Sequence, residues 1–176
     1  MTNPTRSVNA HVRIADVSVH RTGNLLVVWH PVPPSVHALR DAVLAGSADA
    51  GDPLPVRSLA APDAGVDDVE GAAAAVLITT ENFGMVAGLM KDFLERIYPW
   101  FEEVPNRRPG LPYLLISKGG TDGTGAVRDV SRILTGLRWK PALPPIVVAG
   151  AITNDQLLHV REQAATLVAG VDGGVF

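Results

Sequence analysis

The chain has 176 residues, of which 47% are hydrophobic, so it can bury the core of one domain and is not a disordered chain. Its net charge of -3 offers no broad basic surface, and we therefore expect no nucleic-acid partner. The absence of cysteine excludes disulfides, thiolate chemistry and cysteine-ligated metals. With no apolar stretch of membrane-spanning length and no secretion-signal core, we expect a cytoplasmic protein without a membrane partner.

Residues 1–23 are polar and mixed, and we expect them to form an N-terminal tail or extension. Residues 24–176 then form a single domain. Its first apolar run, 25–29, is typical of a central parallel strand covered on both faces. We expect Ser35 to cap the helix that follows and Gly46 to end it.

The same alternation of apolar runs and amphipathic segments continues along the chain. Further strands are predicted at 54–59, 74–79, 113–117 and 146–149. A short helix is expected within 62–70, and longer helices after Gly84, after Gly125 and from Thr153 or Asn154 to about Val168. Pro99 is expected to end the helix after Gly84, whose apolar face comprises Val86, Leu89, Met90, Phe93, Leu94 and Ile97. Five strands that alternate with helices indicate βαβ units and a mostly parallel sheet.

Three loops follow predicted strands and precede helices, at 30–35, 80–84 and 118–124. The carboxyl ends of parallel strands meet at one edge of a sheet, so these loops should converge there. Helix N-termini offer free N–H groups and partial positive charge, which suit phosphate. The sequence therefore predicts a ligand site at this edge.

Two of these loops carry recognisable patterns. The stretch 80–96 reads TENFGMVAGLMKDFLER and resembles the third-strand motif of the flavodoxin-like family, which includes NAD(P)H-dependent FMN reductases and quinone-reductase-like proteins. The stretch 118–127 reads KGGTDGTGAV and resembles the fourth-strand loop of the same family, particularly of actinobacterial members. The resemblance covers about 25–150.

The resemblance implies a three-layer α/β/α sandwich with a five-stranded parallel sheet of order 2-1-3-4-5. It also implies FMN at the switch point, with its phosphate held by the loop after the first strand and its ring between the other two loops. Carried over to this chain, the cofactor-binding residues are His30, Val32, Ser35, Val36, Thr80, Glu81, Asn82, Phe83, Gly84, Lys118, Gly119, Gly120, Asp122 and Gly123. No catalytic residue is assigned, because the flavin itself would supply the redox chemistry.

The first of these loops departs from the family pattern. It reads HPVPPSVH at 30–37, and its three prolines remove three N–H donors. Only Ser35 offers a hydroxyl there, and a phosphate with so few donors is expected to bind poorly. A charged His30 or His37 would be the means of compensation.

Each of these features also has a structural interpretation. Phe83 and Met85 could instead start a packed helix, and Asp122 could be a turn or capping residue. The glycines of 119–125 could serve a tight turn alone. The histidines show no metal-ligand spacing, so no metal site is predicted. The aromatic cluster of Tyr98, Trp100 and Phe101 is open to three interpretations: core packing, a rim over the site, or a subunit contact in a homo-oligomer.

Two functional hypotheses follow. The first is an FMN-binding, NAD(P)H-dependent oxidoreductase of small acceptors such as quinones or free flavin. The second is a flavodoxin-fold protein that has lost FMN and acts as a non-catalytic binding or assembly module. The loops after Thr80 and Lys118 favour the first hypothesis, and the proline-filled loop favours the second.

Overall fold

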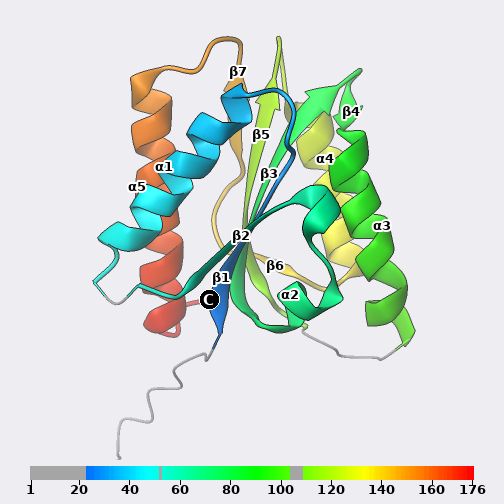
Figure 1. Cartoon of the computed structure of the whole chain (residues 1–176), viewed down its shortest axis with the longest axis vertical. Helices are drawn as coiled ribbons and strands as arrows, with labels where there is room; N and C mark the ends of the chain where they lie inside the picture. The colour runs from blue at the N-terminus through cyan, green and yellow to red at the C-terminus, as the bar shows by residue number, and fades with distance from the viewer. Residues whose placement is uncertain (1–22, 52, 104–108) are drawn as a thin grey trace, which may run out of the picture.

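The protein is described from a computed structural model that covers residues 23–51, 53–103 and 109–176. It is a three-layer α/β/α sandwich, with helices on both faces of a central sheet (Figure 1). The elements in chain order are β1 Asn24–Trp29, α1 Ser35–Asp49, β2 Val56–Ala60, the 3-10 turn η1 Ala61–Asp63, α2 Val66–Glu70, β3 Ala72–Asn82, β4 Met85–Val86, α3 Gly88–Glu103, β5 Pro112–Gly119, α4 Thr124–Gly136, β6 Lys140–Pro141, β7 Ile146–Ala149 and α5 Asn154–Asp172.

The sheet confirms the predicted flavodoxin-like order, with one correction to the strand count. The strand order is β2-β1-β3-β5-β6, and β7 also pairs with β5, so that β6 and β7 share the fifth position. The short β4 pairs antiparallel with the end of β3, which brings the total to seven strands instead of five. Pro144 and Pro145 lie between β6 and β7, and because they lack N–H groups they cannot extend a ladder there.

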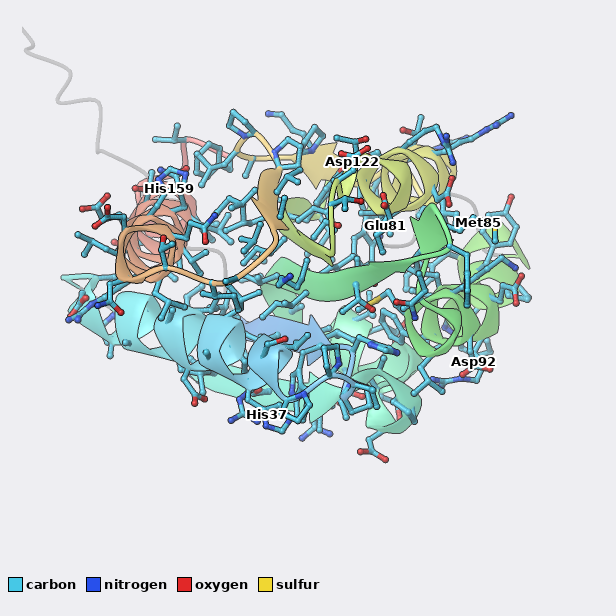
Figure 2. All side chains as sticks on the ribbon, turned by 90° about the horizontal axis from the view of Figure 1, so that it is seen from above. His37, Glu81, Met85, Asp92, Asp122 and His159 are labelled. Carbon is cyan, nitrogen blue, oxygen red and sulfur yellow. The ribbon has the colours of Figure 1, made fainter. Side chains whose placement is uncertain are left out.

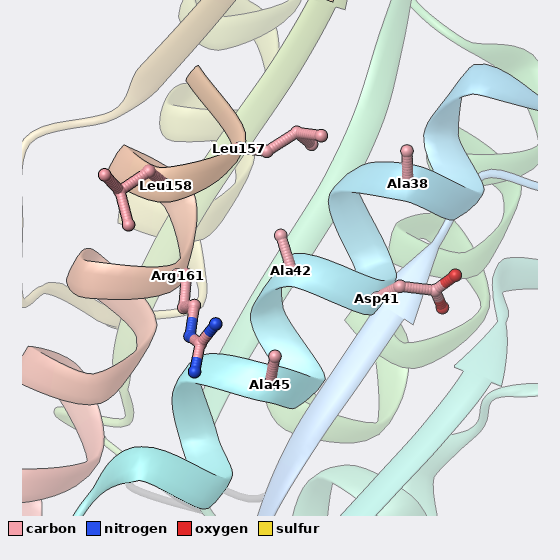
Figure 3. A pocket seen from close by; sticks show the side chains of 7 residues that line it. All are labelled: Ala38, Asp41, Ala42, Ala45, Leu157, Leu158 and Arg161. Carbon is pink, nitrogen blue, oxygen red and sulfur yellow. The ribbon is translucent and has the colours of Figure 1, made fainter. Parts of the chain in front are cut away.

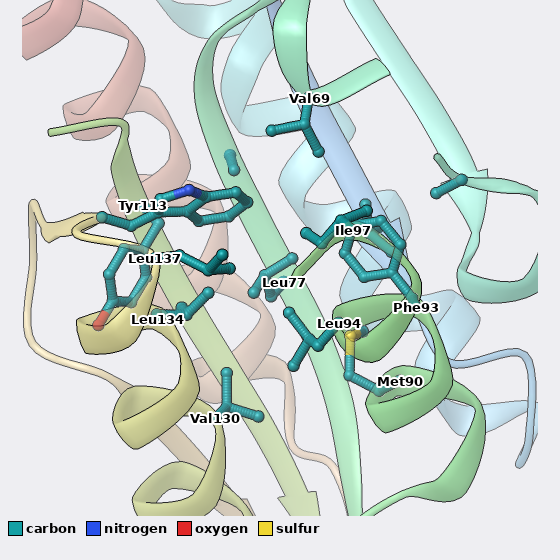
Figure 4. Close-up of a cluster of buried hydrophobic side chains, with 14 of the residues drawn as sticks. Val69, Leu77, Met90, Phe93, Leu94, Ile97, Tyr113, Val130, Leu134 and Leu137 are labelled. Atoms are coloured by element: carbon teal, nitrogen blue, oxygen red, sulfur yellow. The ribbon is translucent and has the colours of Figure 1, made fainter. Parts of the chain in front are cut away.

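The core lies on both sides of the sheet. Alternate residues of β1 and β3 point to opposite faces, so Leu26 and Leu77 belong to the cluster under α3 and α4, whereas Leu25 and Val76 belong to the cluster under α1 and α5. All four are fully buried. Figure 4 shows Leu77 among the side chains of α3 and α4. Double-sided burial explains why these strands read as continuous apolar runs, and each such side chain contributes about 1.5–3 kcal/mol.

Both predicted ends of α1 are wrong. Ser35 is the first helical residue, and Pro34, at the N-cap, makes no side-chain capping bond. Gly46 lies inside the helix, which continues to Asp49. A Cβ on Gly46 would lie 2.0 Å from the carbonyl oxygen of Arg161, so this glycine allows α1 and α5 to cross closely.

The predicted termination of α3 at Pro99 is also wrong, because the helix runs on to Glu103. Phe101, beyond the proline, is buried in the core, and its packing favours continuation of the helix. Two residues of the predicted apolar face of this helix differ from expectation: Leu89 is 38% exposed, and Val86 is buried but belongs to β4. The other members of the face are buried in α3.

The last helix begins as predicted. The Thr153 hydroxyl accepts a hydrogen bond from the Gln156 N–H, and the Gln156 side chain accepts one from the Thr153 N–H. The helix extends to Asp172, further than expected.

One sequence prediction lies outside the described residues, namely the N-terminal tail at 1–23, of which only Gly23 is described. Within the described ranges, no helix is both long and apolar enough to cross a membrane. The same ranges hold no cluster of three or more His, Asp or Glu residues with metal-binding geometry.

Candidate functional site

The candidate site lies at the carboxyl edge of the sheet. The helices that follow β1 and β3 cover opposite faces, so the chain diverges between these two neighbouring strands. Ligands of open α/β sheets bind at such a switch point. Figure 2 looks down on this edge, with Glu81 and Met85 on the side of α3 and α4, and His37 on the side of α1.

The loop after β3 is a tight hairpin instead of a direct helix start. β4 pairs with β3 through Glu81 and Val86, and through Asn82 and Met85. The two turn residues both have positive φ, 56° at Phe83 and 74° at Gly84, which defines a type I′ turn. The interpretation of Phe83 and Met85 as the start of a packed helix is therefore wrong.

The position of Phe83 at the hairpin tip is unfavourable in two respects, its backbone conformation and the exposure of its ring. Its φ lies in the left-handed region, which costs a residue with a Cβ roughly 1–2 kcal/mol. Its side chain is 99% exposed, so the ring contributes no burial energy, and the neighbouring Met85 is 55% exposed. Strain and apolar exposure at one residue are typical of a functional position.

The hairpin is fastened to the start of α4. Glu81 Oε2 accepts hydrogen bonds from the N–H groups of Gly125, at 2.6 Å, and Ala126, at 3.4 Å. The Val86 N–H donates to Asp129 Oδ2 at 3.1 Å. A Cβ on Gly125 would lie 2.2 Å from the Gly84 carbonyl oxygen, so only glycine allows this approach. The hairpin and α4 thus form one unit.

A buried histidine joins the ends of β1 and β3. His30 is 5% exposed, and its Nδ1 lies 3.3 Å from the Thr80 hydroxyl, which donates to Asn82 Oδ1 at 3.2 Å. Desolvation lowers the pKa of His30 below its ordinary value of 6.5, so the imidazole is neutral at neutral pH. A neutral ring cannot supply the positive charge that the sequence analysis considered for phosphate.

The loop after β5 is closed largely on itself. A Cβ on Gly119 would lie 2.4 Å from the Asp122 carbonyl oxygen, and one on Gly123 would lie 2.9 Å from Val147 Cγ1. The Asp122 carboxylate accepts from both the N–H and the hydroxyl of Thr124. These contacts support the tight-turn and capping interpretations. Gly120 differs, because the space beside it is open.

The loop after β1 offers few backbone donors. Pro31, Pro33 and Pro34 have no N–H. Three more N–H groups are consumed by backbone carbonyls: His30 donates to Ile78, Val36 to Pro33 and His37 to Pro34. Within 30–37, only the N–H groups of Val32 and Ser35 are left without a backbone acceptor in the turn, and Val32 is 58% exposed.

The side chains of Arg40 and His37, near this loop, are also engaged. The Arg40 guanidinium lies 4.8 Å from the centroid of the Trp29 ring, and its Nε and Nη2 donate to Asp41 at 2.9 and 2.7 Å. His37 packs edge-on against Trp29, with ring centroids 5.0 Å apart. The residues present do not fit the FMN phosphate.

The structure thus brings together Thr80, Glu81, Asn82, Phe83 and Gly84 in one hairpin. This hairpin contacts the start of α4, directly after the loop that contains Lys118 and Gly120. Sequence reasoning did not assign Asp129 and Gly125 to the hairpin support. The available signal for the hairpin was the Phe83-Gly84 turn between Asn82 and Met85. Its sequence indicates a hairpin only once the antiparallel pairing of β3 with β4 is known.

Two other regions lie away from this edge. The aromatic cluster at the end of α3 is at the opposite edge of the sheet, so it cannot form a rim over the site; Phe101 packs in the core (Figure 1). A groove of about 490 Å³ runs between α1 and α5, lined by Ala38, Asp41, Ala42, Ala45, Leu157, Leu158 and Arg161 (Figure 3). It lies on the outer face of these helices and not at the switch point.

Comparisons with known proteins agree with the topology. No protein-family model matches the chain, and no curated protein matches its sequence. Among solved structures, it is similar to a flavodoxin from the domain Archaea, with 14% identity, a TM-score of 0.72, and coverage of 84% of this chain and 98% of the other. It is also similar to a WrbA-like flavodoxin from Agrobacterium tumefaciens, with 16% identity, a TM-score of 0.66, and coverage of 85% and 97%.

A third similar structure is the flavodiiron core of Flv1 from Synechocystis sp. PCC6803, with 13% identity and a TM-score of 0.70. That match covers 90% of this chain, which spans about 38% of the length of the flavodiiron protein. At these low identities, the TM-scores of 0.66 to 0.72 establish the shared architecture alone. The chain therefore has the flavodoxin-like fold.

Proposed function

We propose that this protein binds a flavin ring at its carboxyl edge and acts as an oxidoreductase. The observation that carries the proposal is the exposed, strained Phe83 on a hairpin fastened to α4, beside the switch point of a flavodoxin-like sheet. A flat aromatic ligand would recover the apolar contact that Phe83 otherwise lacks, which is worth about 0.5–1.5 kcal/mol.

The chain's own residues divide the work of binding. Phe83 and Met85 offer exposed apolar surface, and Gly120 leaves open space beside the backbone of the facing loop. Glu81 holds the hairpin in place through Gly125 instead of facing the ligand with a free carboxylate. When bound, the flavin supplies the hydride and electron transfer.

The finer assignments remain proposals. They comprise NAD(P)H as the hydride donor and a quinone or free flavin as the small-molecule acceptor. Of the remaining predicted contacts, Thr80 is occupied by His30 and Asn82, whereas Lys118 donates to the Gly119 carbonyl at 2.6 Å.

A second candidate function is favoured by the loop after β1. Because this loop does not fit a phosphate, the protein could be a flavodoxin-fold binding or assembly module without a cofactor. The two functions differ in whether any flavin binds.

Purified protein separates the two functions directly. For the first function, we expect released flavin after denaturation, or quenching of flavin fluorescence on titration, with a rise in melting temperature. A ligand at one hundred times its dissociation constant stabilises the native state by about 2.7 kcal/mol. If the protein quenches the fluorescence of neither riboflavin nor FMN, and neither flavin raises its melting temperature, the oxidoreductase function is rejected in favour of the binding or assembly module.

A further inference from the structure

We infer that the carboxyl edge takes a flavin ring that carries no phosphate, so that riboflavin is a better description of its ligand than FMN. This inference rests on the proposed function and names the ligand class of the same site. It follows from a difference between two parts of the edge. The hairpin at 81–86 offers apolar surface for a ring, whereas the loop at 30–37 offers few donors for a phosphate.

Most backbone N–H groups at the start of α1 are already satisfied, and within 30–37 only those of Val32 and Ser35 lack a backbone acceptor. A helix N-terminus binds phosphate through N–H groups that lack partners. Here the N–H groups of Val36 and His37 donate at 3.0 Å to the carbonyls of Pro33 and Pro34. A phosphate would have to break these bonds, and the three prolines of the loop give it no N–H in exchange.

The side chains do not replace the missing donors. Ser35 is the one hydroxyl of the loop. His30 is buried and neutral, and Arg40 is held by the Trp29 ring and by the carboxylate of Asp41. Asp41 also places a negative charge next to that guanidinium.

The hairpin at 81–86 is not affected by this lack of donors. Phe83 and Met85 project from a hairpin anchored by Glu81 and Asp129, and this anchoring involves no residue of the loop after β1. A phosphate dianion must give up strong hydration on binding, and burial of such a charge without partners is unfavourable. The phosphate of FMN should therefore add nothing to the affinity of its ring.

The test is a pair of fluorescence titrations of the full chain with riboflavin and with FMN. We expect the dissociation constant for FMN to be within about threefold of that for riboflavin, or larger. An FMN affinity more than about threefold higher than the riboflavin affinity would overturn the inference while leaving the proposed function intact. Binding of neither flavin would overturn both.

A loop variant tests the stated cause. Replacement of Pro31→Thr, Pro33→Ser and Val36→Thr adds two N–H groups and three hydroxyls. We expect FMN to bind about tenfold more tightly to this variant, with riboflavin affinity unchanged. The matched control replaces two exposed prolines before β7, Pro144→Ser and Pro145→Ser. This control should leave the ratio of FMN affinity to riboflavin affinity unchanged. A loop variant that melts like the wild type and shows the same ratio would overturn the role given to the loop.

Discussion

The Glu81 carboxylate, at the end of β3, accepts a hydrogen bond from the Gly125 N–H at the start of α4, at 2.6 Å. The two residues are 44 positions apart in the chain. Through this contact a side chain of the hairpin caps a helix of the next βα unit. The position of Phe83 therefore depends on a helix N-terminus that belongs to a different loop.

Replacement of Glu81→Gln should lower the free energy of unfolding by about 1–2 kcal/mol, because a charged acceptor is lost from partly buried N–H groups. Urea denaturation measures the change. The matched control is Glu95→Gln on the exposed face of α3, where the ion pair with Lys91 is worth at most a few tenths of a kcal/mol. Equal effects for the two variants would show that Glu81 is not a stabilising cap.

Replacement of Phe83→Asn should separate stability from binding. Asparagine tolerates positive φ and suits the type I′ turn, so the variant should be more stable by about 0.5–1 kcal/mol. It should also bind the flavin ring roughly two- to tenfold more weakly, because the aromatic contact is lost. Thermal denaturation and flavin titration check the two effects.

The control for this substitution is Leu158→Asn, at an exposed apolar residue in the groove between α1 and α5. It should leave flavin affinity unchanged. If Phe83→Asn binds flavin as tightly as the wild type, Phe83 has no role in binding.

Protonation of His30 should destabilise the fold. Its pKa in the folded state is lowered by burial, so below pH 6.5 the unfolded chain binds the proton more readily than the native one. The stability that this residue contributes is complete above pH 6.5 and is lost as pH falls from there through the folded-state pKa. Urea denaturation between about pH 5 and pH 8 should show the decline, and His30→Asn should be less sensitive over the same range. Parallel curves for the two proteins would contradict this account.

Replacement of Gly46→Ala should destabilise the protein by about 1–3 kcal/mol, since the new methyl group would lie 2.0 Å from the Arg161 carbonyl oxygen and force α1 and α5 apart. Gly51→Ala is the matched control, because no atom lies within 4 Å of the added carbon. Thermal denaturation of both variants makes the comparison. A similar melting temperature for the two would mean that the helices separate at little cost.

Much of the fold is encoded locally. The apolar runs that contain Leu26 and Leu77 predict buried parallel strands, because double-sided burial demands apolar residues at every position. Thr153 or Asn154 as a cap predicts the start of α5, because a capping side chain acts on N–H groups within one turn of itself, and the structure assigns this role to Thr153. The strand count differs because β4 and β6 have two residues each, too few to show a periodicity.

The candidate site divides in the same way. The sequence by itself determined the location of its loops and the lack of donors at Pro31, Pro33 and Pro34, since a missing N–H is a property of the residue. Only the tertiary structure decided the partner of Glu81, the burial of His30 and the close approach at Gly46. These features depend on contacts between elements that are distant in the sequence, and local sequence patterns do not predict such contacts.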